Sequence, residues 1–131
     1  MTIYCDESGG VGAGIMCLSA ISIPADAADE LLQQMRAVIG VRGELKGSRI
    51  TLSERAYCIE LLMRLGGKAV IACADIATLR RHHDGKAPED MALYAHLLET
   101  ALDPWMLESG GCIDVRIDDG RYDTRLNAML R

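Results

Sequence analysis

Short runs of apolar residues alternate with longer segments of helical spacing along the chain. Four of these runs are only five to nine residues long and are bounded by glycine, proline or acidic residues. That length and those boundaries are typical of β-strands rather than helices. The predicted strands are residues 1–5, 15–23, 68–75 and 112–118.

The segments between the runs carry apolar residues at helical spacing, with recognisable ends. A helix is predicted over Ala25–Ile39, with acids in its first turn and Gly40 as its stop. Thr51 and Glu54 form a capping-box pattern before a helix over Leu52–Leu65. A third helix is predicted to start at Pro88, and Pro104 is expected to end or kink it. A last helix is predicted over 124–131, with Asp123 as its candidate cap. Residues 79–86 are predicted to be irregular or a short helical turn.

Four glycines between Gly9 and Gly14 separate the first two predicted strands. Their spacing does not match Gly-x-Gly-x-x-Gly or a P-loop, and a strand follows them rather than a helix N-terminus that could face phosphate. The segment is therefore predicted to be the turn of a β-hairpin and not a nucleotide-binding loop.

The predicted order of elements is β-β-α-α-β-α-β-α, which indicates a single α/β domain over residues 1–131 with a mixed sheet flanked by helices. Three of the strands end in a carboxylate, at Asp6, Asp75 and Asp118. Ligands of open α/β sheets gather beyond the carboxyl ends of parallel strands. Strand alternation separates Asp6, taken as the inward-pointing candidate ligand, from Glu7, which should face the other way.

Composition limits the classes of function. The net charge of −5 over 131 residues gives no overall attraction to nucleic acid, so binding to nucleic acid would need a local basic surface. The five cysteines include no Cys-x-x-Cys pair and lie in apolar runs. This favours free thiols in a reducing compartment over a zinc site or a disulfide framework. With no signal peptide and no spanning segment, a cytoplasmic protein without membrane contact is expected.

Carboxylates at strand ends suit a hard divalent cation such as Mg²⁺, which prefers oxygen ligands. Asp6 and Asp118 form the natural pair, and Glu44 in the mixed-charge loop could be the third ligand. Lys46 and Arg49 could hold substrate phosphates. The structural alternatives are that Glu44 and Lys46 are solvated loop charges and that Asp75 caps the segment after it.

A basic segment follows the third predicted strand and is the only concentrated one in the chain. Arg80, Arg81, His82, His83 and Lys86 lie within seven residues. A solvated surface run is the favoured interpretation, with a contact to nucleic acid as the alternative.

Three segments together resemble a known family. Tyr4-x-Asp6-Glu7-Ser8-Gly9, Glu44-Leu45-Lys46-Gly47 and Ile117-Asp118-Asp119 are similar, in order and spacing, to the motifs of the family called domain of unknown function 3800. The resemblance implies a ribonuclease H-like mixed sheet and a metal-dependent nuclease, often linked to mobile elements. It points to Asp6, Glu44 and Asp118 as ligands of Mg²⁺ or Mn²⁺. The family's C-terminal Gln-x-x-Asp-like motif has no match here, which suggests a fragment or a short variant.

The leading hypothesis is therefore a divalent-metal-dependent nuclease that cleaves phosphodiester bonds of RNA or DNA. Asp6, Glu44 and Asp118 would bind the metal, Lys46 and Arg49 would position phosphate, and Ser8 would shape the turn beside Asp6. The alternative is a catalytically inactive ribonuclease H-like module that binds nucleic acid or protein. A phosphotransfer enzyme with Asp6 as nucleophile is a weaker reading, because the expected Asp-x-Asp pattern has Ser8 in its second position.

Overall fold

The computed structural model describes residues 2–40, 46–108, 110 and 113–117. Their contacts divide the chain into two compact units. We call residues 22–68 the helical unit, and residues 2–21 with the described residues from 69 onwards the sheet unit. No helix in the described ranges is long and apolar enough to cross a membrane.

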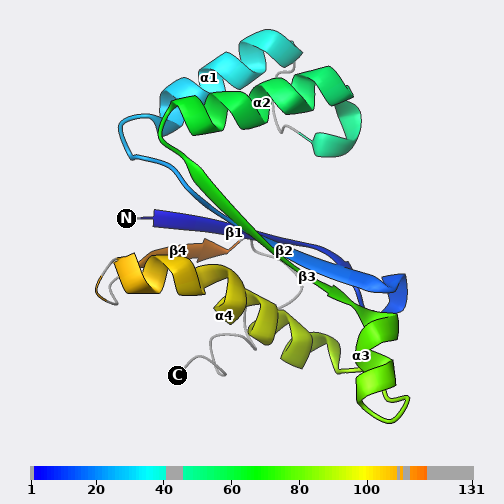
Figure 1. Ribbon diagram of the computed structural model, residues 1–131. Helices are drawn as coiled ribbons and strands as arrows, with labels where there is room; N and C mark the ends of the chain where they lie inside the picture. Colours follow the sequence, from blue (N-terminus) through cyan, green and yellow to red (C-terminus); the bar gives the residue numbers. More distant parts are fainter. Residues whose placement is uncertain (1, 41–45, 109, 111–112, 118–131) are drawn as a thin grey trace. The chain divides into compact units, whose positions relative to one another are not determined.

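A four-stranded mixed sheet is the centre of the sheet unit (Figure 1). Its order is β3-β2-β1-β4, and β4 pairs with β1 in parallel. In Figure 1, β2 runs opposite to both β1 and β3, which makes the first three strands antiparallel. The strands are β1 Thr2–Gly10, β2 Ile15–Ser22, β3 Lys68–Asp75 and β4 Asp114–Ile117.

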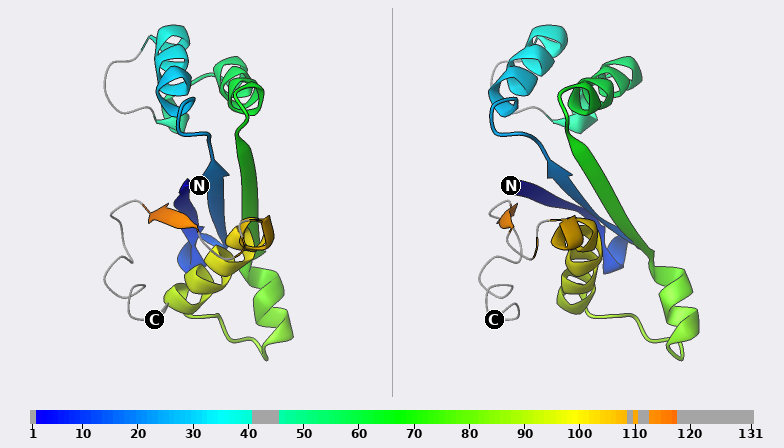
Figure 2. Two further views of the ribbon diagram at one scale, coloured as in Figure 1. Left: turned by 90° about the vertical axis from the view of Figure 1, so that its left-hand side faces the viewer. Right: turned by 60° about the vertical axis from the view of Figure 1, so that its left-hand side comes forward.

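One face of this sheet is covered by the long helix α4 (Asp90–Glu108), as the two views in Figure 2 show. Buried side chains of β1 and β2 form a single apolar core with it, including Ile3, Met16 and Leu18 from the strands. Tyr94 and Trp105 from α4 are among the largest fully buried side chains. Burial of this area is the main stabilising term for the sheet unit.

The helical unit contains α1 (Ala28–Ile39) and α2 (Leu52–Arg64), which contact each other. The predicted capping box at the start of α2 is confirmed. The backbone N–H of Glu54 donates to Thr51 Oγ1 at 3.2 Å, and the backbone N–H of Thr51 donates to Glu54 Oε1 at 2.9 Å. Gly40 ends α1 in the left-handed conformation, with φ of 70°, as its position predicted.

Three elements differ in extent from the prediction. Residues 79–86 were predicted to be irregular or a short helical turn, and helix α3 (Ile76–His82) includes the first half of them, with Asp75 as its cap and Ile76 in the core. Helix α4 continues through Pro104 to Glu108. Strand β1 extends through Gly10, beyond its predicted end. Among the described residues the order is therefore β-β-α-α-β-α-α-β, and the helix predicted over 124–131 lies outside them.

The expectation that no cysteine pairs was wrong. Cys17 and Cys73 form a disulfide between the neighbouring strands β2 and β3, although 56 residues separate them in the sequence. Their Cα atoms are only 4.1 Å apart, because sheet pairing brings the two positions opposite each other. Cys5 and Cys58 are free and buried.

Candidate acidic site on the open face of the sheet

Asp6 lies in the middle of β1, on the face of the sheet opposite to α4. Burial alternates along the first half of the strand: Ile3 and Cys5 are buried, whereas Tyr4 and Asp6 are exposed. Asp6 is therefore neither at the tip of a strand nor pointing toward the core, which corrects both expectations. A solvent-facing carboxylate in the centre of a strand is still held on a rigid support.

A small cavity of about 240 Å³ opens beside Asp6. The hydroxyl of Ser19 donates to the main-chain oxygen of Asp6 at 3.3 Å, which ties β2 to β1 at this point. The Asp6 carboxylate has no hydrogen bond or ion pair with any described residue. The lining consists of Asp6, Glu7, Ser8, Cys17, Ser19 and Ile71.

Glu7 and Ser8 both share this cavity, although strict alternation would place them on opposite faces. The regular pattern ends at this point of β1, since Ser8 and Gly9 are both exposed. Gly9 has φ of +78°, which is outside the conformation of a regular strand. Glu7 and Ser8 therefore both contribute to the lining of the cavity beside Asp6.

Parallel pairing brings the end of β4 next to Asp6. Ile117, the last described residue of β4, is paired with Cys5, the residue before Asp6. Asp114 and Arg116 are exposed and form an ion pair at 3.5 Å. Asp118 follows Ile117 directly in the sequence and lies outside the described residues.

The other candidate residues belong to the helical unit. Lys46 and Arg49 are both exposed, at the start and end of the short 3₁₀ turn Gly47–Arg49. The turn is closed by a hydrogen bond of 2.9 Å from the backbone N–H of Arg49 to the carbonyl of Lys46. Glu44 lies outside the described residues. Of the candidate residues that the structure describes, Asp6 and Ser8 lie together in the sheet unit, and Lys46 and Arg49 lie together in the helical unit.

Asp75 has the capping role that was its structural alternative. Its Oδ1 accepts from the backbone N–H of Ala77 at 3.3 Å, and its Oδ2 accepts from the hydroxyl of Thr78 at 2.7 Å. The hydrogen bond from Thr78 is the main cause that lowers the pKa of Asp75. In the part of the chain that the structure describes, no group of three or more His, Cys, Asp or Glu side chains could hold a metal ion.

Sequence reasoning missed Cys17, Ser19 and Ile71 as neighbours of Asp6. They come from β2 and β3, and only the pairing of these strands with β1 brings them there. Alternation in β2 could have indicated that Cys17 and Ser19 face away from the core, because they fall between the buried positions 16, 18 and 20. Comparisons of the chain with family models, with curated proteins and with solved structures return no match.

Proposed function

We propose that this protein is a divalent-metal-dependent nuclease of ribonuclease H-like architecture, acting on phosphodiester bonds of RNA or DNA. The observation that carries the proposal is the parallel pairing of Cys5 with Ile117. Each is followed in the sequence by an aspartate, Asp6 and Asp118. The same register continued by one residue would pair the two carboxylate-bearing positions.

Strand periodicity supports the same arrangement. Asp114 and Arg116 are exposed on β4, as Tyr4 and Asp6 are on β1. Because side chains repeat every second residue along a strand, position 118 would share the exposed face with Asp6. A mixed sheet in which β4 is added in parallel beside an antiparallel hairpin is compatible with a ribonuclease H-like core.

The donor set suits the metal that the family resemblance implies. Asp6 offers a carboxylate without a partner among the described residues, and Ser8 and Ser19 add hydroxyl groups around the same cavity. Carboxylate and hydroxyl oxygens favour Mg²⁺ or Mn²⁺ over softer metals, and the one sulfur of the lining, that of Cys17, is held in the disulfide with Cys73. The family resemblance implies Asp6, Glu44 and Asp118 as the ligands of the ion. When bound, it would supply Lewis-acid stabilisation of charge on the phosphate oxygens.

The remaining candidates would act on the substrate. Lys46 and Arg49 would attract the phosphates of a strand, with the arginine able to form a bidentate contact. Ser8 would help to shape the backbone next to Asp6 so that the Asp6 carboxylate stays exposed to solvent.

Cleavage assays on RNA, DNA and hybrid duplexes with Mg²⁺ or Mn²⁺ test the proposal. We expect Asp6→Asn to lower the rate at least about a hundredfold, since even loss of a supporting group around a metal costs about 10–100-fold. Asp114→Asn is the matched control, because it removes the same charge from an exposed position of the neighbouring strand. Equal rates for Asp6→Asn and the wild type, or no cleavage of any substrate, would contradict the proposal.

An inactive binding module remains the second candidate, favoured by the net charge of −5, which gives no overall attraction to nucleic acid. Titration with Mn²⁺ separates the two. The nuclease should bind the ion in a manner that depends on Asp6 and Asp118, whereas the inactive module should show no such dependence.

A further inference from the structure

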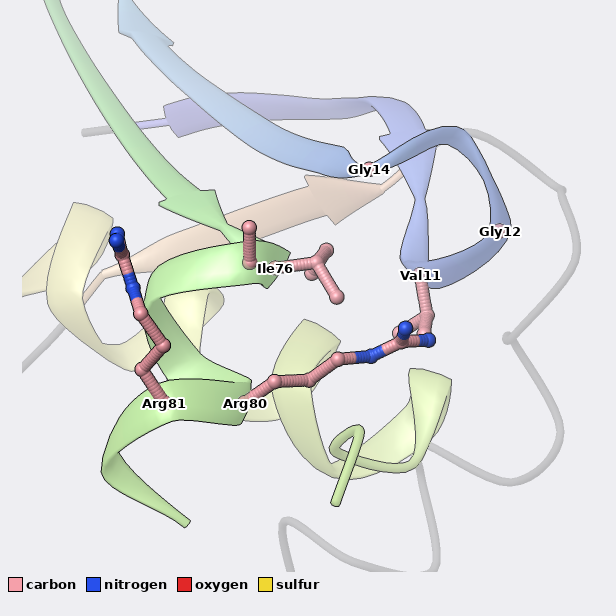
Figure 3. Close-up of a pocket in the computed structure, with 7 residues that line it drawn as sticks. Val11, Gly12, Gly14, Ile76, Arg80 and Arg81 are labelled. Atoms are coloured by element: carbon pink, nitrogen blue, oxygen red, sulfur yellow. The ribbon is translucent and has the colours of Figure 1, made fainter. Parts of the chain in front are cut away.

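A second and larger cavity, of about 480 Å³, lies between the turn after β1 and helix α3 (Figure 3). We call it the Arg80 cavity. Its walls are fixed by two hydrogen bonds: the backbone N–H of Ile76 donates to the carbonyl of Gly14 at 3.0 Å, and that of Val11 donates to Asp90 Oδ1 at 2.9 Å. Its lining consists of Val11, Gly12, Gly14, Ile76, Ala77, Arg80 and Arg81.

Arg80 is a charged residue in the lining of this cavity whose side chain has no partner among the described residues. Figure 3 shows its side chain extending from α3 toward the turn at Val11. The guanidinium has no hydrogen bond or ion pair with any residue in the described ranges. Arg81 is partly engaged, since its Nη2 donates to Thr78 Oγ1 at 3.1 Å and its charge helps to lower the pKa of Asp75. Five N–H donors on Arg80 are thus available to an anion.

The opposite wall offers close access to the backbone. Gly12 and Gly14 carry no side chain, and a Cβ added at either position would meet no atom within 4 Å. The turn that carries these glycines is tied to α4, because the backbone N–H of Val11 donates to Asp90 Oδ1. An anion could therefore approach the glycine backbone from one side and the guanidinium from the other.

The charge around the cavity also favours an anion, although the net charge of the whole protein is −5. Arg80 and Arg81 both line the cavity, and the only acid in the segment from residue 80 to residue 86 is Asp84. This is the local basic surface that binding to a polyanion requires. Asp6 and Val11 are five residues apart along β1 and the turn, so they are at most about 16 Å apart at about 3.3 Å per residue, which a few nucleotides would span.

We propose that the Arg80 cavity binds a backbone phosphate of the nucleic-acid strand, at a distance from the acidic site. The choice of nucleic acid as ligand rests on the proposed function. Arg80 would contact the phosphate directly, and Gly12 and Gly14 would leave room for it. The cavity would therefore contribute to strand binding and not to bond cleavage.

Binding of fluorescein-labelled single-stranded DNA and RNA oligonucleotides, measured by anisotropy in EDTA, tests this inference without metal or cleavage. We expect Arg80→Ala to weaken binding about tenfold and to reduce the slope of log K against log salt by about one. Lys86→Ala is the matched control, since it removes one positive charge from the same segment but outside the cavity lining. It should change the affinity less than about twofold.

Gly12→Glu gives an independent test, because it adds a negative charge beside the cavity at a position with open space. We expect it to weaken binding at least tenfold with unchanged thermal stability. Equal losses for Arg80→Ala and Lys86→Ala, binding of inorganic phosphate but not of oligonucleotides, or no binding at all would overturn the inference. Arg80-dependent binding without any cleavage in Mg²⁺ would uphold it while the nuclease proposal fails.

Discussion

Three glycines, one near the end of β1 and two in the turn before β2, allow a graded test of how the backbone near Asp6 is held. Gly9 has φ of +78°, and a Cβ there would overlap the main-chain oxygen of Ile15. Gly14 has φ of +82° but open space around it, and Gly12 has open space and no positive φ. Substitution of each by alanine separates the cost of the backbone conformation from the cost of the steric overlap.

The expected losses follow from these differences. A left-handed conformation costs a non-glycine residue about 1–2 kcal/mol, so Gly14→Ala should lower the free energy of unfolding by about that amount. Gly9→Ala adds an overlap with main-chain atoms that cannot rotate away, worth about 1–3 kcal/mol more. Its total is about 2–5 kcal/mol. Gly12→Ala should leave stability unchanged or raise it by up to about 1 kcal/mol, because alanine restricts the unfolded chain.

Urea unfolding followed by tryptophan fluorescence measures all three variants. Trp105 is the only tryptophan of the chain and is 2% exposed in the core of the sheet unit, so its emission reports unfolding of the unit that contains the hairpin. Far-UV circular dichroism gives an independent transition for comparison. Equal losses for Gly9→Ala and Gly14→Ala would refute the claim that close approach to Ile15 excludes a side chain at position 9.

Two further predictions concern ionisable groups. The pKa of Asp75 is lowered below its ordinary value of 3.8, so its charged form stabilises the folded state above that pH, and this contribution is lost as the pH falls through the folded-state pKa. Asp75→Asn should therefore lower the melting temperature at pH 7 but not at pH 2, and an equal deficit at both would contradict the assignment. Burial raises the pKa of Cys5 to about 11, and its side chain is 4% exposed. Iodoacetamide at pH 8 should leave Cys5 unmodified in the native protein and alkylate it in urea, as peptide mass spectrometry would show; equal labelling in both would contradict its burial.

Local residue patterns determined much of the secondary structure. The capping box at Thr51, the stop at Gly40 and the bounds of β3 were predicted, because each depends on residues within a few positions of one another. The α/β class and the mixed sheet followed from the order of these elements. Helix α3 was only partly predicted, because its polar, charged sequence has no wide apolar face and is anchored mainly through Ile76.

Tertiary structure decided what lies around the candidate site. Alternation along β1 places Asp6 on one face of the sheet and Ile3 and Cys5 on the other. Which face is buried depends on α4, a helix that follows more than 80 residues later in the sequence and packs on one face of the sheet. The disulfide between Cys17 and Cys73 and the pairing of Cys5 with Ile117 likewise join positions that are distant in the sequence. A short-range pattern contains no information about such pairings, since they are selected by burial of the whole core and by the register of neighbouring strands. The sequence alone therefore identified Asp6 as a candidate, whereas only the fold determined that it faces solvent beside the end of β4.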